Sequence, residues 1–141
     1  MLGKILIFGI CVLVLISAPH AFAIDGIHRV ELKNARLVNA FGEASAQNIN
    51  TNQQVQISAD VTNKQDKNQD FVYIVQILDQ NNVPVQLTWI KASFKSQQTF
   101  SPALSWVTDK PGTYTAQIFF WDSIQNADAL ATNLELKITV S

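Results

Sequence analysis

Few side chains in this chain are of the types that perform catalysis, and they lie far apart in the sequence. A nucleophile such as serine needs a base held by a third group, and histidine is the usual base. Apart from His20 in the N-terminal apolar segment, the only histidine is His28, close to the expected start of the folded part. A carboxylate pair that cleaves glycosidic bonds would have to be brought together by the tertiary structure, and Glu31, Glu43 and Glu135 lie in separate segments. We therefore expect no catalytic residue and no enzymatic activity.

Carboxylates that share a turn could instead hold a cation. Asp66 and Asp70 lie in one polar turn, and Asp122 and Asp128 lie in another. Calcium takes about six to eight oxygen ligands, and neither turn has the dense acidic spacing with glycine that is typical of calcium loops. Asp25 and His28, beside the amine of a processed N-terminus, form a weaker motif for a transition metal. We expect no metal and no cofactor, and an exported metal-binding protein is kept as a second alternative.

The first 23 residues have the pattern of a secretory signal peptide. Lys4 provides a positive start, residues 5–16 are apolar, and Ala21-Phe22-Ala23 is a small-x-small cleavage site. Spanning a bilayer takes about 20 apolar residues, so the segment is short for an anchor. We expect cleavage after Ala23 and a folded domain over residues 24–141, in a secreted or cell-surface protein. The alternative is a retained segment, which would then be the chain's one contact with the membrane.

The charge of the chain argues against nucleic acid as a partner, and its cysteine content argues against disulfides in the folded domain. Without Lys4 the chain has nine basic and eleven acidic residues, and the basic ones are scattered. Nucleic acid is therefore not expected as a partner, because binding it depends on clustered phosphate contacts. Cys11 is the only cysteine, and it lies in the signal segment. The processed domain would have to be held by packing and hydrogen bonds alone.

Seven segments have the composition and alternation of β-strands, with turn residues between them. They are residues 30–41, 54–63, 71–78, 83–90, 99–107, 113–121 and 130–140. The segment 71–78 is apolar on both faces, which favours a central position in a sheet. Pro102 interrupts the segment 99–107. No segment after residue 23 has a helical period. The sequence therefore predicts an all-β fold, a single antiparallel sandwich of about seven strands.

The strand entry Pro111-Gly112-Thr113-Tyr114, together with the segments 54–63 and 70–78, carries a family resemblance. These residues are similar to immunoglobulin-like and CARDB-type β-sandwich domains of secreted or surface proteins of archaea and bacteria. The resemblance implies that Tyr114 is a buried corner residue whose hydroxyl returns to the backbone. Ala116 stands where antibody domains have a cysteine, so aliphatic packing would replace the disulfide. Domains of this architecture mostly mediate adhesion, ligand binding or assembly.

Strict alternation from Tyr114 predicts an exposed apolar face on one sheet. If Tyr114 points inward, Phe119 and Trp121 point outward. The same alternation on the segment 71–78 places Phe71 and every second residue after it inside, and it places three apolar residues outside. These three are Val72, Ile74 and Leu78. In an immunoglobulin-like order the two strands are neighbours, so their outer faces would merge into one patch.

An apolar patch of this kind favours a binding function. The leading hypothesis is a non-catalytic module for adhesion, binding a protein partner or itself through Trp121, Phe119, Val72, Ile74 and Leu78. A polysaccharide-binding module that stacks sugars on Phe119, Trp121 and Trp89 is the first alternative. A structural alternative is that the segment 42–53 or 122–129 covers the patch. Trp89 continues the apolar phase Val85-Leu87-Trp89, and Trp106 continues the phase Leu104-Trp106. We expect them to pack in the core or at its rim.

Overall fold

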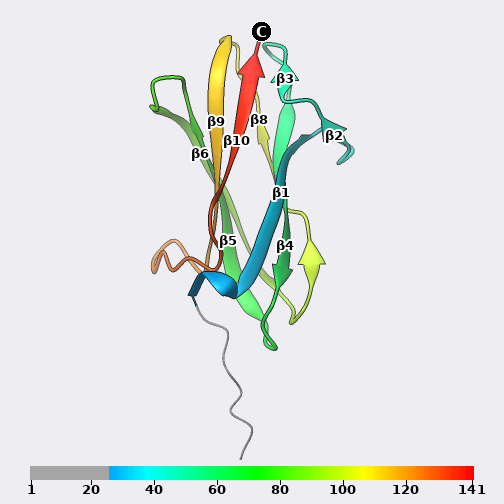
Figure 1. Cartoon of the computed structure of the whole chain (residues 1–141), viewed down its shortest axis with the longest axis vertical. Helices are drawn as coiled ribbons and strands as arrows, with labels where there is room; N and C mark the ends of the chain where they lie inside the picture. The colour runs from blue at the N-terminus through cyan, green and yellow to red at the C-terminus, as the bar shows by residue number, and fades with distance from the viewer. Residues whose placement is uncertain (1–25) are drawn as a thin grey trace, which may run out of the picture.

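The computed structural model describes residues 26–141, which form two β-sheets packed face to face (Figure 1). The predicted all-β sandwich is therefore confirmed. A short 3₁₀ helix, η1 (Gly26–His28), precedes the first strand. The predicted signal peptide, residues 1–23, lies outside the described residues. Across residues 26–141, no helix is long and apolar enough to cross a membrane.

The first sheet has the order β2–β1–β4, and β4 also pairs with β7 and β8. These strands are β1 (Val30–Val38), β2 (Ala44–Ser45), β4 (Val55–Asn63), β7 (Thr99–Phe100) and β8 (Ala103–Trp106). Pro102 separates β7 from β8, as its missing N–H predicts. The hydroxyl of Ser58 donates to its carbonyl at 2.9 Å and ties this break to β4.

The second sheet has the order β3–β10–β9–β5–β6. Its strands are β3 (Asn48–Ile49), β5 (Gln69–Leu78), β6 (Pro84–Phe94), β9 (Gly112–Trp121) and β10 (Leu134–Val140). β3 runs parallel to β10, and the other pairs are antiparallel. β5 lies between β9 and β6, which explains why both of its faces are apolar and confirms its predicted central position.

Several predicted boundaries differ from the structure. The first strand was expected to reach residue 41 and ends at Val38, and β5 begins at Gln69 rather than at residue 71. Residues 42–53, expected as a connection, contain β2 and β3, which extend the two sheets at their edges. β6 continues beyond residue 90 to Phe94. The last strand begins at Leu134 rather than at residue 130. Leu130 is nevertheless fully buried, because its N–H donates to the carbonyl of Phe120 at 2.9 Å and draws the preceding loop onto the core.

The core lies between the sheets and contains a cluster of four phenylalanines. Phe71, Phe94 and Phe120 come from the second sheet, whereas Phe100 comes from β7 of the first. The rings of Phe71 and Phe120 are stacked with centroids 4.7 Å apart, and Phe94 and Phe100 meet edge to face at 5.6 Å. The contacts of Phe100 with Phe71 and Phe94 therefore join the two sheets by aromatic packing.

The corner expected at Tyr114 is present. Its ring is buried against Trp106 with a centroid distance of 5.0 Å, and its hydroxyl donates to the carbonyl of Lys110 at 2.9 Å. Gly112 enters the strand with φ of 148°, which side chains rarely allow. Ala116 is fully buried. The inward phase of β9 is therefore the predicted one, and it fixes which side chains of this strand face outward.

Candidate binding face

The outer face of the second sheet brings the predicted residues of β5 and β9 together. Val72 lies directly opposite Trp121 and Ile74 lies directly opposite Phe119 in the antiparallel register. Residues that are directly opposite in such a pair point to the same side of the sheet. The rings of Phe119 and Trp121 are in contact, with centroids 5.7 Å apart. The two strands are therefore adjacent, as expected.

β6 adds two apolar side chains to this face that sequence reasoning placed elsewhere. Leu87 lies opposite Gln76 and Trp89 opposite Ile74, so both point outward. Leu87 is 52% exposed and Trp89 is 46% exposed. The expectation that Trp89 packs in the core or at its rim is wrong, because the inward phase of β6 is the one that contains Phe94. Trp106, in contrast, is buried as expected.

These side chains surround an open hollow of about 310 Å³. Ile124, from the loop that follows β9, completes its apolar wall. We call this surface the aromatic face, and it consists of Ile74, Leu87, Trp89, Phe119, Trp121 and Ile124. The structural alternative was that a loop covers this face, and the loop after β9 reaches only its margin. The loop after β9 contributes Ile124, and the residues of β6 remain open to solvent.

Two of the predicted site residues face outward but lie beneath their neighbours. Val72 is fully buried and Ile74 is 6% exposed. Val72 lies between Trp121 and Lys91 across the strands, and these longer side chains flank it on the same face. The prediction that Val72 and Ile74 contact a ligand needs correction, since they form the floor of this surface. They support the aromatic side chains that surround the hollow.

Leu78 lies away from the aromatic face. It is opposite Thr115, and the pair Gln76–Gln117 separates it from Ile74 and Phe119. Its outward phase is the predicted one, but it does not line the hollow. Gln76 and Gln117 also point outward, so this polar pair interrupts the apolar surface between Ile74 and Leu78. Leu78 is therefore not brought together with the other predicted site residues.

A second hollow, of about 300 Å³, lies on the other side of Phe119 and Trp121. It is lined by Ile27 of η1 and by residues of the segment 129–133. Ile27 is 45% exposed. Phe119 and Trp121 line both hollows and therefore form a ridge between them.

A row of polar side chains borders the aromatic face on one side. The amide of Gln76 donates to Gln117 at 3.5 Å, and the amide of Gln117 donates to Glu135 of β10 at 3.1 Å. At the next outward-facing pair of β10 and β9, Lys137 donates to the hydroxyl of Thr115 at 2.7 Å. An apolar centre with a polar border is the usual anatomy of a protein interface.

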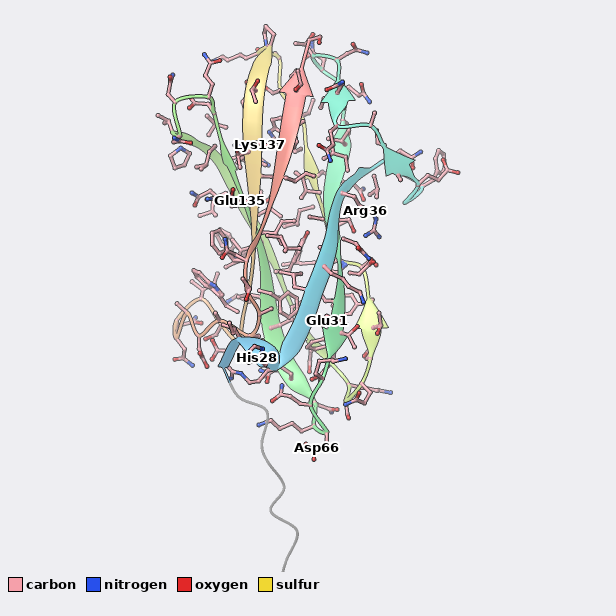
Figure 2. The ribbon with its side chains drawn as sticks, viewed as in Figure 1. His28, Glu31, Arg36, Asp66, Glu135 and Lys137 are labelled. Carbon is pink, nitrogen blue, oxygen red and sulfur yellow. The ribbon has the colours of Figure 1, made fainter. Side chains whose placement is uncertain are left out.

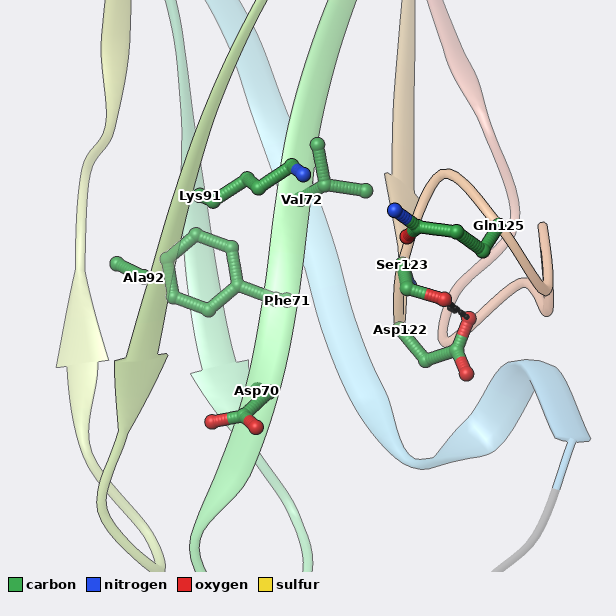
Figure 3. Close-up of a pocket in the computed structure, with 8 residues that line it drawn as sticks. All are labelled: Asp70, Phe71, Val72, Lys91, Ala92, Asp122, Ser123 and Gln125. Atoms are coloured by element: carbon green, nitrogen blue, oxygen red, sulfur yellow. Dashed lines mark hydrogen bonds between the residues drawn. The ribbon is translucent and has the colours of Figure 1, made fainter.

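On the opposite side the face ends at a polar hollow of about 330 Å³ (Figure 3). Lys91 and Asp70 approach it from β6 and β5, and Asp122 and Ser123 approach it from the loop after β9 (Figure 3). Asp122 accepts hydrogen bonds from the backbone N–H of Ser123 at 2.6 Å and of Asp128 at 3.1 Å. Burial raises the pKa of Asp122, but these bonds and one from Asn126 outweigh it, so its pKa is lowered. Asp122 therefore organises its own loop.

The remaining candidates for chemistry are dispersed. His28 lies at η1, Asp66 at the tip of the turn after β4, and Glu135 on β10 (Figure 2). Asp128 pairs with Arg29 at 2.7 Å. Within residues 26–141 no three His, Cys, Asp or Glu side chains are grouped as metal ligands would be. Metal binding stays the second alternative.

The comparisons with known proteins agree on the fold. No family model matches the chain, and no curated protein sequence matches it. The crystal structure of the C-terminal domain of Wzt is similar with a TM-score of 0.65 at 15% identity, over 88% of this chain and 80% of that one. A CARDB domain from Pyrococcus furiosus, solved in complex with di-metal ions, has a TM-score of 0.55 at 12% identity, over 82% of this chain and 97% of that one.

Larger proteins contain the same fold as one part. A β-glucosidase from Listeria innocua matches with a TM-score of 0.58 at 13% identity, over 79% of this chain but only 16% of the enzyme. Likenesses at such identities establish architecture alone. Together with the strand order and the Tyr114 corner, they define the chain as an immunoglobulin-like β-sandwich domain. The predicted resemblance is confirmed at the level of the fold.

Proposed function

We propose that this protein is a non-catalytic, secreted or cell-surface module that binds a protein partner through the aromatic face. The observation that carries the proposal is the group of Trp89, Leu87, Phe119 and Trp121 around an open hollow with polar borders. Soluble proteins rarely leave contiguous apolar surface open without a partner. Tryptophans in such a position commonly supply most of the binding energy of an interface.

The geometry suits a partner with apolar side chains that enter the hollow on either side of the Phe119–Trp121 ridge. Buried Val72 and Ile74 hold the floor in place, so the ridge is presented by two paired strands rather than by a loop. The polar row of Gln76, Gln117 and Glu135 would supply directional contacts at the border. Rigid aromatic side chains lose little entropy on binding, which favours this use.

The proposal is tested by substituting the ridge and measuring capture of a partner from the source organism's cell-surface fraction. Trp121→Ala is expected to weaken capture of the specific partner by about 30-fold or more, the range of interface hot spots. Phe41→Ala is the matched control, because Phe41 is 89% exposed but lies at the turn between β1 and β2, away from the aromatic face. Equal capture by wild type and Trp121→Ala would contradict the proposal.

One observation favours carbohydrate as a second candidate ligand. Gln117 and Glu135 present an amide and a carboxylate beside the Phe119 and Trp121 rings. Sugars are recognised by stacking combined with polar contacts of this kind. Tryptophan fluorescence against a glycan array would detect such binding. Gln117→Ala should abolish it, but should weaken capture of a protein partner far less than Trp121→Ala does, because Gln117 lies at the border of the face. A flat response to every glycan would remove this candidate.

A further inference from the structure

The outer edge of β6 has the features of a strand that pairs with another strand. β6 is the last strand of its sheet, and among residues 26–141 no strand pairs with its outer edge. It is also the longest strand described, with 11 residues. A free row of backbone N–H and C=O groups along such an edge is a template for strand addition.

Both faces of β6 expose apolar side chains. Leu87 and Trp89 point to the outer side of the sheet, while Ile90, 37% exposed, lies opposite Tyr73 and points to the inner side. An edge strand that meets water usually carries polar residues on its open face. Apolar side chains that are exposed on both faces of an edge strand are instead a feature of interaction surfaces.

The devices that normally protect an edge are present only at the two ends of β6. Pro84 and the register shift at Ile77–Leu78 lie at its start, and Lys91 lies near its end. Residues 85–90 between them contain no charge and no proline. Charges, prolines and bulges are the usual means of blocking strand pairing. The middle of the edge is therefore unguarded.

We infer that the outer edge of β6 pairs antiparallel with the same edge of a second copy of this chain. A twofold axis at Thr88 places Leu87 of one copy opposite Trp89 of the other on the same face of the sheet. The two five-stranded sheets then form one continuous sheet, and the two aromatic faces become adjacent. This contact uses the backbone edge of β6. It is therefore distinct from the Phe119–Trp121 ridge, although Leu87 and Trp89 belong to both surfaces.

The distribution of charge favours a second copy in the antiparallel direction. Lys91 lies near the end of β6 and Lys95 follows the strand, whereas Asp79 is the only charged residue of the turn 79–83 that precedes it. Antiparallel pairing moves the basic end of each copy toward the acidic turn of the other. Parallel pairing would set the lysines of the two copies side by side, which is unfavourable.

Site-directed crosslinking tests the register. In the full chain carrying Cys11→Ser, Thr88→Cys provides a single thiol that faces its own counterpart across the axis at a separation that a disulfide can span. Mild oxidation should produce a covalent dimer at least ten times faster than for Ser93→Cys. Ser93 is exposed on the same strand but lies far from its counterpart in this register. Equal rates for the two variants would overturn the proposed pairing.

Sedimentation equilibrium tests the association itself and separates it from partner binding. Wild type should show a monomer–dimer equilibrium, and Leu87→Lys should shift its dissociation constant by at least tenfold toward monomer. Circular dichroism checks that Leu87→Lys remains folded, as expected for a half-exposed side chain. Trp121→Ala should lose the partner but keep the dimer. A wild-type chain that stays monomeric to near-millimolar concentration, or a dimer that Trp121→Ala dissociates, would refute the β6 pairing.

Discussion

At the scale of single residues, the strongest electrostatic arrangement lies on the first sheet, away from the aromatic face. Asp60 of β4 accepts hydrogen bonds from Ser101 at 2.6 Å, Asn34 at 2.8 Å and Arg36 at 2.9 Å. Asn34 reaches it from a bulge in β1, where its φ of 56° is left-handed. The hydrogen bonds from Ser101 and Asn34, with the charge and hydrogen bond of Arg36, lower the pKa of Asp60 from 3.8 to about 2.

This arrangement predicts a specific loss of stability in acid. Because the pKa of Asp60 is lower in the folded state, its contribution is complete above about pH 4 and is lost as the pH falls through 2. We expect this contribution to be about 1 to 2 kcal/mol, after allowing for screening by solvent. Urea unfolding of wild type and Asp60→Asn at pH 6 and pH 2 measures it, since other carboxylates affect both proteins alike. An equal loss in the two proteins would show that Asp60 contributes nothing.

At the scale of elements, Tyr114 links the turn before β9 to the strand itself. Its hydroxyl bonds Lys110 and its ring packs on Trp106 of β8. Tyr114→Phe should lower the free energy of unfolding by about 1 kcal/mol and speed amide exchange in residues 109–113. Tyr73→Phe is the control, because the Tyr73 hydroxyl donates to Ile57 at 3.1 Å and lies in another part of the core. The Tyr73→Phe variant should lose stability, but amide exchange in residues 109–113 should not become faster.

Strand order also explains why only part of the aromatic face could be predicted. The alternation of β5 and β9 correctly placed Phe119 and Trp121 outside, because Tyr114 set the phase of one strand and Phe71 that of the other. Alternation on β6 correctly indicated that Leu87 and Trp89 share a face, but the prediction that this face points to the core or its rim was wrong. The answer depended on the inward placement of Phe94, beyond the predicted end of that strand. Ile124 was missed because a loop residue follows no period.

At the scale of the whole molecule, the two sheets are held together without a disulfide in the described residues. Phe120 of β9 contacts Phe71 and Phe94, and Phe100 of the first sheet packs against the same two rings. Phe120→Ala should therefore cost about 3 to 5 kcal/mol, since it leaves a cavity where the sheets join. Phe41→Ala, at an open turn, should change stability by less than about 0.5 kcal/mol. Urea denaturation measures both, and similar values for the two variants would contradict this role of Phe120.

The amino-acid sequence by itself determined the class of fold, the turn at Pro111-Gly112 and the phase of the two central strands. These are local properties, because side chains alternate along any strand and proline and glycine restrict the backbone where they occur. Only the tertiary structure decided that Val72 and Ile74 are covered, that Leu78 is separated from them, and that Trp89 is open. Burial of an outward side chain depends on the size of its neighbours on adjacent strands, and those neighbours are distant in the chain.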